Sequence, residues 1–140
     1  MPLDSDLNAL CDYLRDRLEM NVTAGRPDAN VPGVYVWPWR IVPKPEIRNS
    51  LPQPRSGPAV VSFRVNCLLL ITPADTLESL AKLDLAGQAI QANPILEGAA
   101  GPLRVMLDPI GTEELAALFM AARLQLTLCL PFALEGSPPS

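Results

Sequence analysis

Apolar and polar residues alternate most regularly between residues 59 and 71. One side of an extended chain would there be entirely apolar: Ala59, Val61, Phe63, Val65, Cys67, Leu69 and Ile71. A period of two predicts a strand with one face in the core. The alternation recurs at Leu124, Leu126, Leu128, Leu130 and Phe132, and more briefly over residues 103–107. We therefore predict strands over 59–71, 103–107 and 124–132, with the first and last paired in one sheet and Phe63 and Leu128 buried.

A period of three to four residues predicts three helices. Residues 5–19 place apolar side chains on one face at Leu7, Leu10, Cys11, Leu14 and Leu18. A second helix over 75–92 follows Thr72-Pro73-Ala74-Asp75 and stops at Asn93-Pro94. A third runs from Gly111 to about Ala122, where the acidic pair Glu113 and Glu114 suits the helix dipole. We expect the first two helices to cover the paired strands.

Prolines interrupt this pattern between a short strand that starts at Val34 and the strand over 59–71. Six of them lie within residues 38–58, where they remove backbone donors and disfavour a central strand or a helix. We predict that 38–58 is a protruding arm. Residues 1–135 then form a single α+β domain, with a mixed or antiparallel sheet and helices on one face, and residues 136–140 form a flexible tail.

Composition excludes several classes of chemistry. The chain of 140 residues contains no histidine, which removes histidine-based triads and histidine metal sites. Its three cysteines are far apart, which indicates buried thiols in a reducing compartment. Gly98-Ala-Ala-Gly101 lacks the spacing of a phosphate-binding loop. We therefore expect no enzyme activity, no metal and no cofactor.

Charge and hydropathy narrow the class of partner. A net charge of −4 argues against a nucleic-acid backbone as the ligand. The chain has no apolar run of 18 residues, and its first residues lack the basic and apolar regions of a signal peptide. We expect a soluble cytoplasmic protein without direct membrane insertion.

The sequence singles out a candidate protein interface around the start of the arm. Trp37 and Trp39 are the only tryptophans, and a spacing of two puts them on one face of an extended chain. Arg40, Lys44, Arg48 and Arg55 follow, opposed only by Glu46. Tryptophan and arginine are common interface anchors, although a purely core role for the two indoles remains open.

The two halves of the chain differ in charge. Residues 1–70 carry eight basic and seven acidic side chains, whereas residues 71–140 carry three and eight. A basic arm and an acidic body can pack head to tail, and such a contact closes into a ring when the rotation permits.

Four stretches resemble a known family. They are the opening helix Leu7-Asn-Ala-Leu-Cys-Asp-Tyr-Leu, the strand that starts at Val61, the helix end Gln91-Ala-Asn-Pro-Ile-Leu, and the block from Leu103 through Leu130. In this order they resemble the cap or tail-terminator proteins of phage-tail-like contractile injection systems, in particular the amino-terminal domain of the Photorhabdus virulence cassette type of cap.

The resemblance implies a structural subunit that closes the end of the tube and sheath distal to the baseplate. It implies a ring, expected to be a homohexamer, with tube or sheath proteins as partners and no catalytic residues. The particle would assemble in the cytoplasm and could be released. The alternative interpretation from the residues is a small acidic secretion chaperone that binds an effector segment, although a chaperone has no use for a basic, proline-rich arm.

Overall fold

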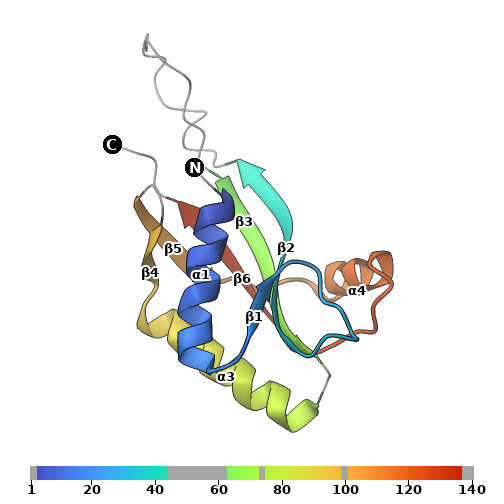
Figure 1. Cartoon of the computed structure of the whole chain (residues 1–140). Helices are drawn as coiled ribbons and strands as arrows, with labels where there is room; N and C mark the ends of the chain where they lie inside the picture. Colours follow the sequence, from blue (N-terminus) through green and yellow to red (C-terminus); the bar gives the residue numbers. More distant parts are fainter. Residues whose placement is uncertain (1–2, 44–62, 73–74, 99–100, 137–140) are drawn as a thin grey trace.

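The computed structural model describes residues 3–43, 63–72, 75–98 and 101–136 (Figure 1). These residues form an α+β domain, as predicted, and all three expected helices are present. The elements are α1 (Leu3–Leu18), β1 (Val22–Ala24), β2 (Gly33–Pro43), β3 (Phe63–Thr72), α3 (Thr76–Ala92), β4 (Ile95–Gly98), β5 (Gly101–Leu107), α4 (Thr112–Ala121) and β6 (Cys129–Gly136).

The strands of the described residues form one mixed sheet in the order β1-β2-β3-β6-β5-β4. β1 runs parallel to β2, and the other neighbours are antiparallel. β3 lies between β2 and β6, and Cys67 of β3 is opposite Phe132 of β6. This confirms the predicted pairing of the two amphipathic strands.

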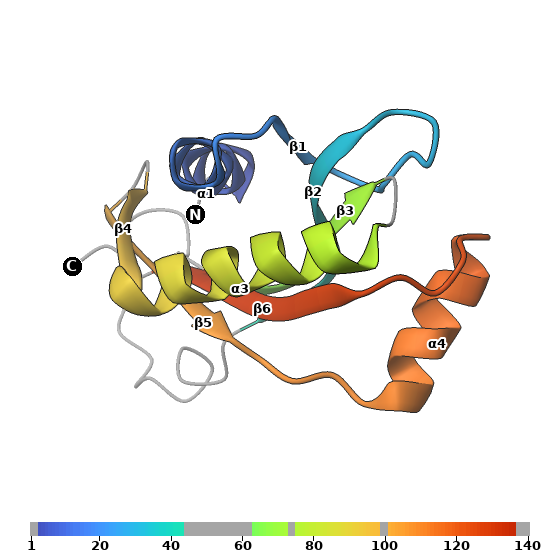
Figure 2. The same cartoon turned by 90° about the horizontal axis from the view of Figure 1, so that it is seen from below.

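Helices cover both faces of the sheet. α1 and α3 pack on one face, where Leu10 and Leu14 of α1 join Cys67, Leu69 and Phe132 in the larger core cluster. α4 packs on the opposite face, where its Phe119 meets a smaller cluster that contains Tyr35, Leu68 and Leu70 (Figure 2). The prediction that the helices lie on one face of the sheet thus holds for α1 and α3, whereas α4 lies on the other face. The second face needs a cover because β3 is apolar on both sides from Cys67 to Ile71.

The proline-rich arm was predicted to begin at Pro38, but β2 continues to Pro43. β1 pairs only with Val34–Val36, so β2 is an edge strand from Trp37 onward among the described elements. A β-bulge between Pro38 and Arg40 shifts the register against β3. Edge positions and bulges are the two places where a strand tolerates proline, since the missing N–H then faces away from the sheet. Residues 44–58 of the expected arm lie outside the described residues.

The last strand is shifted toward the C-terminus relative to its prediction. β6 spans Cys129–Gly136 rather than 124–132, so Gly136 belongs to the sheet and not to a tail. Residues 124–128 are neither helix nor strand, and Leu128 is 45% exposed rather than buried. Phe63 is half-buried at the start of β3. Residues 137–140 of the expected tail lie outside the described residues.

Two short strands, β1 and β4, were not predicted, because three or four residues give no readable period. β4 forms a hairpin with β5 that lies against α1. At Gly98 a Cβ atom would lie 2.5 Å from Oδ1 of the buried Asp6. A side chain at position 98 would have to displace the Asp6 carboxylate, which favours glycine there.

Candidate protein-interface surface

Trp37 joins β2 to α4. Its ring lies 5.9 Å from that of Phe119 at an interplanar angle of 84°, an edge-to-face contact. Phe119 is 2% exposed, and Trp37 is half-buried. Trp39 packs against the same cluster, so the two indoles share one face of the sheet, as their spacing predicts. Both rings therefore contribute to the packing of α4 against the sheet.

Trp39 and Arg40 form the surface end of this cluster. The Arg40 guanidinium lies 4.8 Å from the centre of the Trp39 ring, a cation–π contact. Arg40 Nη1 also lies 3.8 Å from Glu114 Oε1 of α4, and both side chains are half-exposed. A half-exposed pair at this distance adds little to the stability of the fold.

A polar pocket of about 120 Å³ lies beside Trp39 and Arg40. Its lining includes Asn66 of β3 and Asp108, which follows β5. The Asn66 Nδ2 donates to Asp108 Oδ2 over 3.3 Å, and the Asn66 Oδ1 is buried without a hydrogen-bond partner among the described atoms.

Arg64 of β3 forms ion pairs with two carboxylates next to this pocket. Its guanidinium pairs with Asp108 at 2.8 Å and with Glu135 of β6 at 3.0 Å. The hydrogen bond with Asp108 raises the pKa of Arg64 above its usual value, and the hydrogen bond with Glu135 adds to the rise. The charges next to the pocket are thus held in place by β3 and β6.

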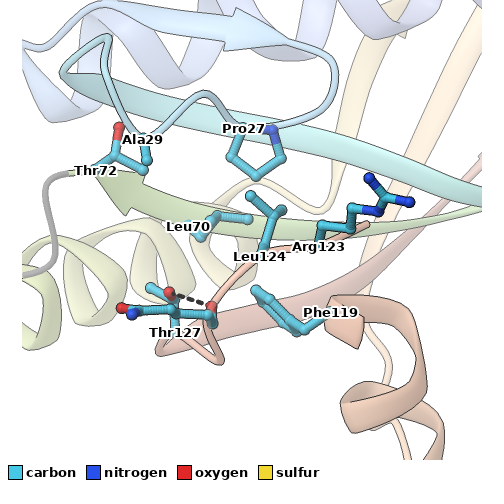
Figure 3. A pocket seen from close by; sticks show the side chains of 9 residues that line it. Pro27, Ala29, Leu70, Thr72, Phe119, Arg123, Leu124 and Thr127 are labelled. Carbon is cyan, nitrogen blue, oxygen red and sulfur yellow. Dashed lines mark hydrogen bonds between the residues drawn. The ribbon is translucent and has the colours of Figure 1, made fainter. Parts of the chain in front are cut away.

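A larger cavity of about 310 Å³ opens between the β1–β2 loop and the segment after α4. Pro27, Leu70, Phe119 and Leu124 line it, with Arg123 and Thr127 at its polar side (Figure 3). The Arg26 guanidinium donates to the Ala122 carbonyl oxygen and joins the same loop to the end of α4. The cavity is largely apolar.

Of the six predicted interface residues, the structure brings together Trp37, Trp39 and Arg40. Lys44, Arg48 and Arg55 lie outside the described residues. Glu114 was not predicted as the partner of Arg40, because its place in the first turn of a helix is explained by the helix dipole alone. Ile41, which is 55% exposed in β2, was not predicted either. The sequence feature that could have indicated Ile41 is the apolar pair Ile41-Val42 directly before Pro43.

The cysteines behave as small apolar residues. Burial raises the pKa of the Cys11 thiol to about 11, and it also raises the pKa of Cys67 and of Cys129. Within the described part of the chain, no three histidine, cysteine, aspartate or glutamate side chains lie close enough together to hold a metal ion. No helix there has both the length and the apolar character of a membrane span.

The arrangement of sheet and helices matches a solved structure. That structure is the sheath/tube terminator, in the extended state, of an extracellular contractile injection system of the PVC type, and the match has a TM-score of 0.69. The chain has the fold of a sheath/tube terminator. The match covers 99% of this chain and 58% of the terminator chain, at 13% identity. No family model and no curated protein matches the sequence.

The terminator fold agrees with the resemblance drawn from the sequence. At 13% identity the likeness lies in the path of the chain. Its coverage includes both ends of the sheet and all three helices of the described residues, because 99% of the chain is matched. The surface of Trp37, Trp39, Arg40 and Glu114 thus belongs to a terminator-like domain.

Proposed function

We propose that this protein is a tail terminator, a structural subunit that closes the end of the tube and sheath of a contractile injection particle at the end distal to the baseplate. The observation that carries the proposal is the terminator fold, matched over 99% of the chain. The chain spans 58% of the length of the terminator that it matches. The proposed role is therefore that of the domain which the two proteins have in common.

Termination in this proposal is passive. The protein occupies the exposed end ring, so that no further tube or sheath subunit can add. Such a role needs a complementary surface and a ring of matching symmetry, and we propose a homohexamer. It needs no nucleotide, metal or covalent step. Assembly takes place in the cytoplasm, and the finished particle can be released.

The test is binding to particle ends. Particles purified without this protein are mixed with the purified chain in a chelator and without nucleotide, and labelled protein is located by electron microscopy. We expect the label at one end, distal to the baseplate. Label along the sides, or binding only with nucleotide or metal, would contradict the proposal. A stable dimer that binds an effector segment and ignores particle ends would favour the secretion chaperone instead.

The basic residues of the expected arm give a prediction about the partner contact. Reversal of Arg48 and Arg55 to glutamate should weaken assembly, because the proposed contact pairs these basic residues with acidic side chains of a neighbouring subunit. Exposed pairs contribute about 0.2–1 kcal/mol each, so the double variant should assemble several-fold more weakly at low salt and differ less at high salt. Affinity for particle ends at two salt concentrations measures this effect.

A matched variant separates the arm from net charge. Arg17→Glu with Arg104→Glu changes the charge by the same amount at two exposed positions on α1 and β5. It should assemble like the parent protein. Equal assembly of the arm variant and the parent at low salt would remove the arm from the interface.

A further inference from the structure

The C-terminal half of β2 is a sheet edge among the described strands. β1 ends opposite Val36, so β2 from Trp37 to Pro43 has β3 on one side and no described strand on the other (Figure 1). Val34 N–H donates to Asn21 O and Val36 O accepts from Gly25 N–H, which puts these positions on the β1 side. The alternation, shifted once by the bulge, points the backbone of Ile41 outward.

The prolines make this edge selective. Three positions face outward by the alternation, namely Pro38, Ile41 and Pro43. Only Ile41 among them has an N–H to donate, while all three have carbonyl groups. Prolines discourage indiscriminate edge pairing. An added strand must therefore match the single donor at Ile41, which would hold it in one register.

An apolar groove runs beside the same edge. It has a volume of about 150 Å³ and lies between the first turns of α1 and the sheet, with Leu3, Leu7, Pro38 and Ile41 among its lining residues. Ile41 is 55% exposed. An added strand would cover Ile41 and Leu7 with every second side chain. Such paired use of backbone bonds and alternate side-chain contacts is typical of strand addition.

The same chain contains a strand-like segment without a strand partner. Residues 124–128 read Leu-Gln-Leu-Thr-Leu, the alternation from which a strand was predicted, yet they lie outside every helix and strand. Leu126 is 66% exposed and Leu128 is 45% exposed. The segment carries no charged side chain, so it could cover the apolar groove beside Ile41 without burying a charge.

The segment and the edge cannot meet within one molecule. Leu70 of β3 pairs with Tyr35 on one side and with Cys129 on the other, so residues 124–128 lie near the start of β2. Ile41 lies six residues beyond Tyr35, about 20 Å further along the sheet at the usual rise of a strand. A contact between them must join two copies, head to tail, and repetition of such a contact generates a ring or a filament.

We propose that residues 124–128 of one copy add as a strand to the Pro38–Pro43 edge of β2 in a second copy. This contact depends on the proposed function in one respect: the proposed terminator acts as a ring of copies. It is held by backbone hydrogen bonds and by Leu126 and Leu128 against Ile41 and Leu7. Its strength depends little on salt, in contrast to the contact expected of the basic arm.

Disulfide cross-linking tests the pairing directly. Ile41→Cys and Leu126→Cys are made in separate proteins. Both proteins also carry Cys129→Ser, because Cys129 is partly exposed, whereas Cys11 and Cys67 are buried and can stay. The two proteins are mixed under mild oxidation, both free and bound to particle ends. We expect a covalent dimer from the mixture. Leu77→Cys, at a leucine that is 80% exposed on α3, should cross-link poorly with Ile41→Cys. Equal yields from Leu77 and Leu126, or no cross-link in either state, would overturn the pairing.

Self-association measures its contribution. Ile41→Glu and Leu126→Glu should each weaken association at least tenfold by analytical ultracentrifugation, at low and high salt alike, whereas Leu77→Glu should change it less than twofold. All three proteins should keep the circular dichroism spectrum of the parent. Unchanged association of the first two variants, with end binding retained, would overturn this contact but leave the terminator role intact. Self-association through these residues without end binding would instead overturn the terminator role alone.

Discussion

Particles assembled in cells that lack this protein should have tubes and sheaths of ill-defined or excessive length. A terminator acts by occupying an end, so its loss leaves that end open to further subunits. The expected effect is large, because no other step in the proposed role limits growth there. Negative-stain electron microscopy of purified particles measures the length distribution, which should broaden markedly against the parent strain.

Two controls make this result specific. Expression of the parent chain in the same cells should restore a single length. The Leu77→Glu variant, changed at an exposed position outside both proposed contacts, should restore it equally. Particles of normal length and normal end structure in the absence of the protein would rule out the terminator role and favour the secretion chaperone.

Replacement of Phe132 by alanine should lower the free energy of unfolding by about 3–5 kcal/mol. Phe132 is 1% exposed, and it lies in β6 between Cys67 of β3 and Leu107 of β5. The substitution leaves a cavity in the larger core cluster, where α1, α3 and the sheet meet. Urea denaturation monitored by circular dichroism measures the change, with an unaltered m-value as evidence that only stability has changed.

Leu128→Ala is the matched comparison in the same region of the chain. The sequence pattern placed Leu128 in the core, whereas the structure leaves it 45% exposed. Its replacement should cost less than about 1 kcal/mol, as is usual for surface positions. A loss at Leu128 as large as that at Phe132 would show that the last strand begins where the sequence pattern places it, before Cys129.

Helices were predicted from the sequence almost to the residue, for local reasons. The stop at Asn93-Pro94 and the cap at Asp75, whose side chain accepts from Glu78 N–H at 3.1 Å, act within one turn of the chain. The pairing of the two amphipathic strands was also predicted correctly. The alternation that identifies both strands depends only on which face of each strand is buried, so it can be read from the sequence whichever strand lies alongside.

The interface surface was predictable in part. The spacing of Trp37 and Trp39 indicated a shared face, and the structure places both indoles with the α4 cluster. The contact of Trp37 with Phe119 joins residues 82 positions apart in the chain, which no local pattern encodes. The pairing of Arg40 with Glu114 is of the same kind.

The sequence by itself determined the α+β class, the positions of the helices and the central pairing, because caps, breaks and periodicity are local properties. Only the tertiary structure decided where β2 ends and where β6 begins and ends. Pro38 and Pro43 are compatible with a strand because β1 stops at Ala24, which leaves an edge among the described strands. The alternating leucines at 126 and 128 are exposed because β6 starts at Cys129. Both outcomes depend on which strand lies alongside, and a neighbour in the sheet is a property of the folded chain.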